Sequence, residues 1–230
     1  MNLGIIIQAR MGSTRLPGKV LKKIGALNLL EHILFRLKRL SHTAQIIIAT
    51  STHARDEEIF RFCTVNNVMC FRGAHENVLK RYYDCAVEFK LDHIVRLTGD
   101  DPFFDIGEID NLINLHLESD ADLSHSYPAL PLGVGAEIFT FQALEKSYMS
   151  TTDPYHLEHA DEYILQNADF FKIMILEVPR AKKRSDIRLT VDTPEDYRRA
   201  CYIAETAGKK YLTTELAITF AEKYEHMRGI

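Results

Sequence analysis

Short apolar runs alternate with longer segments of helical periodicity along the first half of the chain. A short, continuous apolar run is typical of a strand buried on both faces of a parallel sheet. Such runs span residues 3–8, 45–50, 68–71 and 93–97. Helical spacing between and after them predicts helices at about 27–40, 56–66, 75–89 and 108–117. This order predicts an α/β fold with a mostly parallel central sheet flanked by helices.

The second half of the chain has a different pattern. Residues 135–141 and 170–178 predict strands on either side of a helix at 154–166, and a strand at 187–191 precedes two helices. Thr193 before Pro194 is a typical helix start. We expect one domain over residues 1–230, with a small inserted β/α arm at about 125–185 that acts as a lid or in dimerisation.

Composition narrows the class of protein. The 230 residues are 46% hydrophobic, enough for a large core, and no apolar run approaches the ~18–20 residues of a membrane helix. The chain enters its first strand without a signal-peptide pattern. Its four cysteines show no CxxC or zinc spacing. We therefore expect a cytoplasmic protein with reduced thiols and no membrane partner.

The net charge of −4 is unevenly distributed. Residues 1–40 hold eight Lys and Arg against one acid, whereas the other 190 residues hold 20 basic and 31 acidic side chains. Cations gathered in one part of an acidic protein favour a small anionic ligand over a nucleic-acid surface.

The loop after the first predicted strand is close to a P-loop. Residues 12–19 are GSTRLPGK, with five residues between the glycines instead of four, and Val20 stands where a P-loop has its magnesium-binding hydroxyl. The loop is therefore not a P-loop. Its glycines let backbone N–H groups approach an anion, and Arg10, Arg15 and Lys19 supply charge. These features predict a site for polyphosphate.

Polar residues gather where the predicted strands end, at Thr50, Arg72, Thr98 and Asp100-Asp101. Ligands of parallel sheets bind beyond this edge. Asp192 stands in the same relation to the predicted strand at 187–191. Magnesium on a phosphate substrate needs only one or two protein carboxylates, so Asp100 and Asp192 predict a Mg²⁺ site. The alternative is structural, with Asp101 in a turn and Asp192 as a helix cap.

The segment 154–159, PYHLEH, places His156 and His159 three residues apart. This spacing lacks the i, i+4 relation of the H-E-x-x-H zinc motif. We expect instead that Glu158 and His159 face a polar site or an interface.

Several segments together resemble the cytidylyltransferases that act on acylneuraminate and 3-deoxy-manno-octulosonate, most of all the branch of the spore coat polysaccharide biosynthesis protein F. They are IIQARMGSTRLPGK at 6–19, ATST at 49–52, FRG at 71–73, NVLKRYY at 77–83, RLTGD at 96–100 and RLTVDTPED at 188–196. The first and last are the most specific, and the order covers nearly the whole chain.

The resemblance implies a glycosyltransferase-A-like, Rossmann-like nucleotidyltransferase, a homodimer that couples CTP to an acidic sugar with Mg²⁺. It implies that Arg15, Lys19 and Asp100 are catalytic and that Asp100 and Asp192 bind metal. The implied nucleotide-binding residues are Ala9, Arg10, Gly12, Ser13, Arg15, Lys19, Thr50, Arg72, Arg81 and Thr98.

Two departures bear on the acceptor and the general base. Asp101 stands where this branch usually has a non-acidic residue, and residues 132–139 (LGVGAEIF) lack an acid expected before their strand. A carboxylated sugar needs positively charged partners, and the candidates are Arg180, Lys182, Lys183 and Arg184. The alternative is that these four residues belong to an exposed loop without a binding role. Asp101 and a metal-bound hydroxyl are both candidates for the general base.

Two other functions fit the same fold. One is a glycosyltransferase with an Asp-x-Asp type of metal motif, for which residues 120–122 (DAD) and 108–110 (EID) are candidates. The other is a nucleotide-binding protein without turnover. Release of pyrophosphate distinguishes the nucleotidyltransferase from both.

Overall fold

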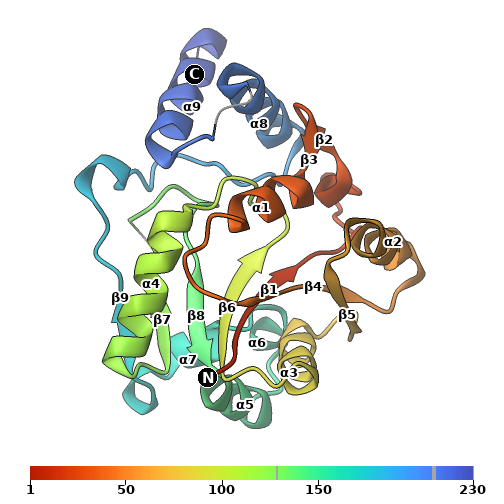
Figure 1. Cartoon of the computed structure of the whole chain (residues 1–230), viewed down its shortest axis with the longest axis vertical. Coiled ribbons are helices and arrows are strands. Elements are labelled where there is room, and N and C mark those ends of the chain that lie inside the picture. Colours follow the sequence, from red (N-terminus) through yellow and green to blue (C-terminus); the bar gives the residue numbers. More distant parts are fainter. Residues whose placement is uncertain (128, 209–210, 230) are drawn as a thin grey trace.

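The computed structural model describes residues 1–127, 129–208 and 211–229. Seven strands of this part of the chain form one sheet in the order β5–β4–β1–β6–β8–β7–β9 (Figure 1). The strands are β1 Leu3–Gln8, β4 Gln45–Ser51, β5 Met69–Gly73, β6 His93–Thr98, β7 Leu123–His125, β8 Glu137–Thr140 and β9 Ile173–Ile175. Only β8 runs antiparallel to its neighbours. The predicted mostly parallel α/β sheet is confirmed.

Helices cover both faces of the sheet (Figure 1). On one face, α1 Leu29–Leu37, α2 Glu57–Asn66 and α4 Ile106–Ser119 pack on a core that includes Ile5 and Ile7. On the other, α3 Val78–Glu88, α5 Phe141–Ser150 and α7 Glu162–Gln166 pack on Ile6 and Ile47. Successive side chains of a strand point to opposite faces, and both faces are covered here. The central strand β1 therefore consists of consecutive apolar residues.

A third core lies beside the sheet under the C-terminal helices α8 Pro194–Ala207 and α9 Thr214–Arg228 (Figure 1). It includes the short hairpin of β2 Lys23–Ile24 and β3 Leu27–Asn28. Helix α8 begins as predicted, because Thr193 caps it, Pro194 occupies the first turn, and Asp196 completes a capping box.

The prediction of a strand at residues 187–191 is wrong. This segment is extended but makes only an isolated bridge between Arg188 and Leu132. Leu189 and Thr190 both donate backbone N–H groups to the carbonyl of Leu132. The pairing stops there because Gly133, with φ of 92°, turns the partner segment away.

The arm also differs from its prediction. The helix predicted at 154–166 is divided into α6 Pro154–Glu158 and α7, because His159 takes extended angles (φ −116°, ψ 97°) and Ala160 enters the core. The strand predicted at 135–141 is only β8, since Thr140 caps α5, and the strand at 170–178 is only β9. Sequence reasoning missed α5, β7 and the hairpin; β2, β3 and β7 are too short to leave a clear pattern.

Candidate active site

A cavity of about 260 Å³ opens where β1 and β6 end. It brings together nine of the predicted site residues, from the phosphate loop, the end of β6 and the segment before α8. These are Ala9, Arg10, Gly12, Ser13, Arg15, Lys19, Thr98, Asp100 and Asp192. The predicted ligand edge of the sheet is therefore a hollow lined by charged groups.

The phosphate loop, residues 9–19, is held from both ends. The N–H of Gly18 donates to the carbonyl of Met11 at 3.0 Å, and the N–H of Met11 donates to Asp56 Oδ1 at 2.7 Å. Gly18 has φ of 68°, a conformation that glycine adopts without strain. Among the described residues, the backbone N–H groups of residues 12–15 have no hydrogen-bond acceptor, and these residues line the cavity. They form a cradle suited to an anion.

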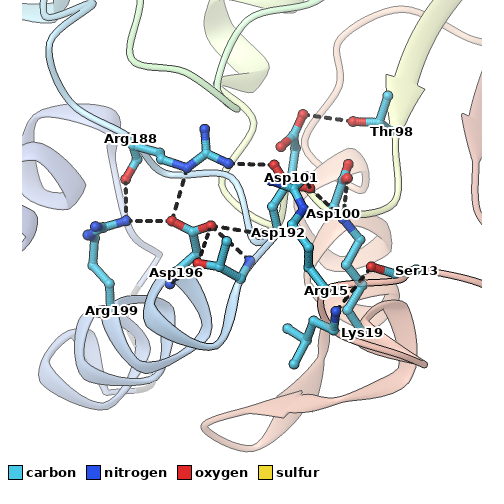
Figure 2. A network of polar contacts seen from close by, with 12 residues as sticks. Ser13, Arg15, Lys19, Thr98, Asp100, Asp101, Arg188, Asp192, Asp196 and Arg199 are labelled. Atoms are coloured by element: carbon cyan, nitrogen blue, oxygen red, sulfur yellow. Dashed lines mark hydrogen bonds and ion pairs between the residues drawn. The ribbon is translucent and has the colours of Figure 1, made fainter.

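Lys19 lies between the two predicted metal ligands (Figure 2). Its Nζ is 2.6 Å from Asp100 Oδ2 and 2.8 Å from Asp192 Oδ1, and Arg15 approaches the same Asp192 oxygen at 3.3 Å. Burial alone would lower the pKa of Lys19, but the two carboxylates outweigh it and raise that pKa. Burial alone would raise the pKa of Asp192, but Lys19, Arg15 and Arg188 lower it. Lys19 and Asp192 are therefore both ionised at neutral pH.

Asp192 reaches this position without belonging to the sheet. The N–H of Val191 donates to the carbonyl of Asp100 at 2.9 Å, which places the two aspartates side by side. Asp196 accepts the N–H of Asp192 at 3.1 Å and pairs with Arg188 and Arg199 (Figure 2). Sequence reasoning missed this positioning role, although the capping-box spacing was a visible signal.

The two carboxylates fit a divalent cation. A single positive charge, the ammonium of Lys19, lies within 2.8 Å of an oxygen from each of them. Among the described residues, no group of three or more His, Cys, Asp and Glu side chains converges as a complete protein metal site. Two carboxylates suit magnesium that takes its other ligands from phosphate and water.

Asp101 is half-buried and does not line the cavity. Thr98 Oγ1 donates to its Oδ2 at 2.7 Å, and the buried Oδ1 has no partner among the described residues. Burial and the charge of Asp100 raise the pKa of Asp101 to about 7. Its position suits support of the loop at 98–101 better than contact with substrate.

The arm closes one side of the cavity. Glu158 and His159 line it, and Glu158 pairs with Arg10 at 2.9 Å. This agrees with the expectation that both residues face a polar site. Arg96 of β6 also lines the cavity. Sequence reasoning did not select it, although a charged residue in an otherwise apolar strand was a signal.

Three predicted nucleotide-binding residues lie outside the cavity wall. Thr50 is fully buried and its Oγ1 has no partner. Arg72 pairs with Glu57 at 2.6 Å. Arg81 is fully buried, donates to the carbonyls of Ala74 and His75, and leaves Nη1 without a partner. Their roles stay predictions.

The four cations offered for a sugar carboxylate do not line the cavity. Lys182 pairs with Asp105 at 2.7 Å and with Glu108 at 2.8 Å. Lys183 and Arg184 also pair with acids outside the cavity. A carboxylate in this cavity needs another partner.

Comparison with known proteins agrees with this geometry. The family model for cytidylyltransferases matches residues 4–226. The spore coat polysaccharide biosynthesis protein SpsF of Bacillus subtilis is 34% identical over 89% of this chain and 87% of its own. A solved cytidylyltransferase from Leptospira borgpetersenii superposes with a TM-score of 0.87 and 32% identity, covering 100% of this chain and 96% of that one.

A more distant structure shares the fold. A CMP:2-keto-3-deoxy-manno-octonic acid synthetase solved with CTP has a TM-score of 0.68 at 18% identity, covering 90% of this chain and all of that one.

The fold is that of a nucleotidyltransferase. This chain belongs to the cytidylyltransferase family. Among the residues that the structure describes, no helix has the length and apolar character needed to cross a membrane.

Proposed function

We propose that this chain couples CTP to a small acidic sugar, giving a CMP-activated sugar and pyrophosphate for surface polysaccharide biosynthesis. The convergence of Asp100 and Asp192 on one cation, beside a loop with unpaired N–H groups, is the main support. The names of the Bacillus subtilis relative and of the synthetase solved with CTP support the acceptor class. We also propose a homodimer, which light scattering would test.

In this proposal the loop binds the triphosphate. The N–H groups of residues 12–15 face its oxygens, and Arg15 and Lys19 supply positive charge. Lys19 is paired with Asp100 and Asp192. These two carboxylates would hold Mg²⁺, which would neutralise phosphate charge and favour attack at the α-phosphorus. Lys19 would then be free to donate to the phosphates.

The reaction is an in-line displacement at the α-phosphorus. A hydroxyl oxygen of the sugar forms the new P–O bond, its proton leaves, and the bond to the bridging oxygen of pyrophosphate breaks. Negative charge grows on the leaving pyrophosphate. Arg15 and Lys19 stabilise that charge more strongly in the transition state than in the ground state.

The glycosyltransferase alternative has less support. Asp120 ends α4 and Asp122 accepts the N–H of Lys172, so both lie beside the start of β7 rather than at the cavity. Glu108 pairs with Lys182, and Asp110 contacts His42. None of these acids lines the cavity.

Thermal shift with each of the four nucleoside triphosphates and magnesium tests the nucleotide. We expect the largest stabilisation from CTP and its loss with EDTA. A pyrophosphate-release screen of ulosonic acids with CTP then tests the acceptor. An equal or absent response to all four nucleotides would contradict the proposal.

A further inference from the structure

A row of polar side chains crosses the sheet below the arm. Arg96 of β6 lies opposite Glu137 of β8, and Glu137 lies opposite His125 of β7. Glu137 is only 1% exposed. Most neighbouring positions of these strands carry apolar core residues, and buried charges are costly unless paired. A row of buried polar side chains at this place therefore indicates a structural or functional role.

The row is incompletely satisfied. Arg96 Nη1 pairs with Glu137 Oε1 and lies 3.6 Å from Asp161 Oδ1 of the arm. Arg96 Nε is buried without a partner, and Nη2 makes no hydrogen bond to any residue that the structure describes. Glu137 Oε2 and His125 Nδ1 are also buried without a partner among the described residues. A buried, unsatisfied group costs about 1–3 kcal/mol, so the fold retains this row at a cost in stability.

Arg96 connects this row to the cavity. It lines the cavity together with Thr98, two residues further along the same face of β6, and with Glu158 and His159 of the arm. The phosphate loop supplies the other cations of the wall, and Arg10 among them is already paired with Glu158. Arg96 is therefore the cation that β6 contributes to the wall on the side of the arm.

We propose that Arg96 binds the carboxylate of the acceptor sugar through its Nη2, and that Glu137 and Asp161 hold the guanidinium in place. This assignment rests on the proposed function and names the residue that recognises the acidic acceptor.

The geometry of the guanidinium favours a carboxylate. Its Nη1 is occupied by the two acids and its Nε is enclosed by protein, whereas Nη2 makes no hydrogen bond to any described residue and can donate a charge-assisted hydrogen bond to a carboxylate in the cavity. The two acids fix the orientation of Nη2, as supporting residues do in specific sites. Burial raises the pKa of Glu137 to about 7, which limits the negative charge beside an incoming carboxylate.

Two variants separate recognition from folding. Arg96→Lys keeps the charge but loses the planar guanidinium that Glu137 and Asp161 hold by Nη1 while Nη2 stays available, and the double variant Arg96→Gln/Glu137→Gln removes the buried pair together. Arg198→Lys on the exposed face of α8 is the matched control. The probes are 3-deoxy-manno-octulosonate, N-acetylneuraminate and glucuronate, each beside its methyl ester. Calorimetry measures their binding to the full chain, and CTP binding is titrated separately.

We expect at least one acid to bind about tenfold or more tightly than its ester, and Arg96→Lys to remove this preference while CTP binding is unchanged. The double variant should also lose the preference, and Arg198→Lys should retain it. Esters that bind as well as acids, absence of acid binding to the wild type, or a preference that survives in Arg96→Lys would overturn the assignment. Loss of CTP binding in the wild type would instead refute the proposed function.

Discussion

The two ends of the cavity are both built from ion pairs, but the acids of the two ends differ in exposure. At the phosphate-loop end, the side chains of Asp192 and Asp100 are 21% and 26% exposed and Arg15 is 61% exposed, although Lys19 between the two acids is only 10% exposed. At the arm end, Glu137 is 1% and Arg96 is 14% exposed. Pairs whose acids reach solvent exchange partners more readily, whereas breaking a pair whose acid is buried is strongly destabilising.

This difference separates two tasks. Lys19 and Arg15 can leave their carboxylates when a metal and a triphosphate bring compensating charges. Arg96 cannot leave Glu137 at similar cost, so its Nη2 keeps a fixed position toward a ligand in the cavity. We infer that the charged groups at the phosphate-loop end exchange partners during binding, and that Arg96 at the arm end selects the acceptor.

The largest expected effect comes from Lys19→Ala. Loss of this cation should lower turnover by about 10²–10³ or more, as for removal of one transition-state donor, and Asp100→Asn should do the same. Without Lys19, Asp100 and Asp192 repel each other, so magnesium should raise the melting temperature of this variant more than that of the wild type. Pyrophosphate release and thermal shift measure both. Lys23→Ala, on the exposed hairpin, is the control, and normal turnover in Lys19→Ala would remove the site assignment.

Glu137→Gln should change the pH dependence of stability. Tyr127, His125, Arg96 and Asp161 surround Glu137, and burial raises its pKa from 4.5 to about 7. Its contribution is therefore present below pH 4.5 and lost as pH rises through 7. Because glutamine does not titrate, the difference in unfolding free energy between variant and wild type should shift by up to about 3 kcal/mol in favour of the variant from pH 4.5 to 7, on top of the pH-independent cost of losing the pair with Arg96. Urea unfolding from pH 4.5 to 8 measures this gain, and parallel curves would refute it.

Asp196→Asn should destabilise the segment that positions Asp192. Burial alone would raise the pKa of Asp196, but Arg188 and the hydrogen bonds at the start of α8 lower that pKa from 3.8 to about 2. Its stabilisation is present above pH 3.8 and lost as pH falls through 2. The variant should lose about 2 kcal/mol at pH 7. Urea unfolding measures the loss, with Asp169→Asn on the surface as control. An unchanged free energy of unfolding would show that this network is not stabilising.

Gly133→Ala should displace the same segment from the other side. Gly133 has φ of 92°, and a Cβ there would lie 2.5 Å from the N of Thr190. We expect a loss of about 1–3 kcal/mol and reduced turnover, because residues 187–192 must shift. Gly107→Ala is the control, since its Cβ would lie 3.4 Å from Asp105 Oδ1. Full activity in Gly133→Ala would mean that Asp192 tolerates this shift.

The sequence by itself determined the four parallel strands β5, β4, β1 and β6 and the phosphate loop. Both depend on local rules: consecutive apolar residues such as Ile5, Ile6 and Ile7 need two covered faces, and glycines after a strand let backbone N–H groups approach an anion. The helix start at Thr193 is also local, since its capping groups lie within three residues.

Only the tertiary structure decided the pairing of distant charges. Sequence analysis placed Asp192 at the end of a predicted strand, but that segment makes only an isolated bridge. The position of Asp192 depends instead on contacts of Val191 with Asp100 and of Arg188 with Leu132. The same holds for Arg96, whose partners Glu137 and Asp161 come from β8 and the arm. Such pairs have no periodic signal, because an ion pair depends on distance in space and not on spacing along the chain.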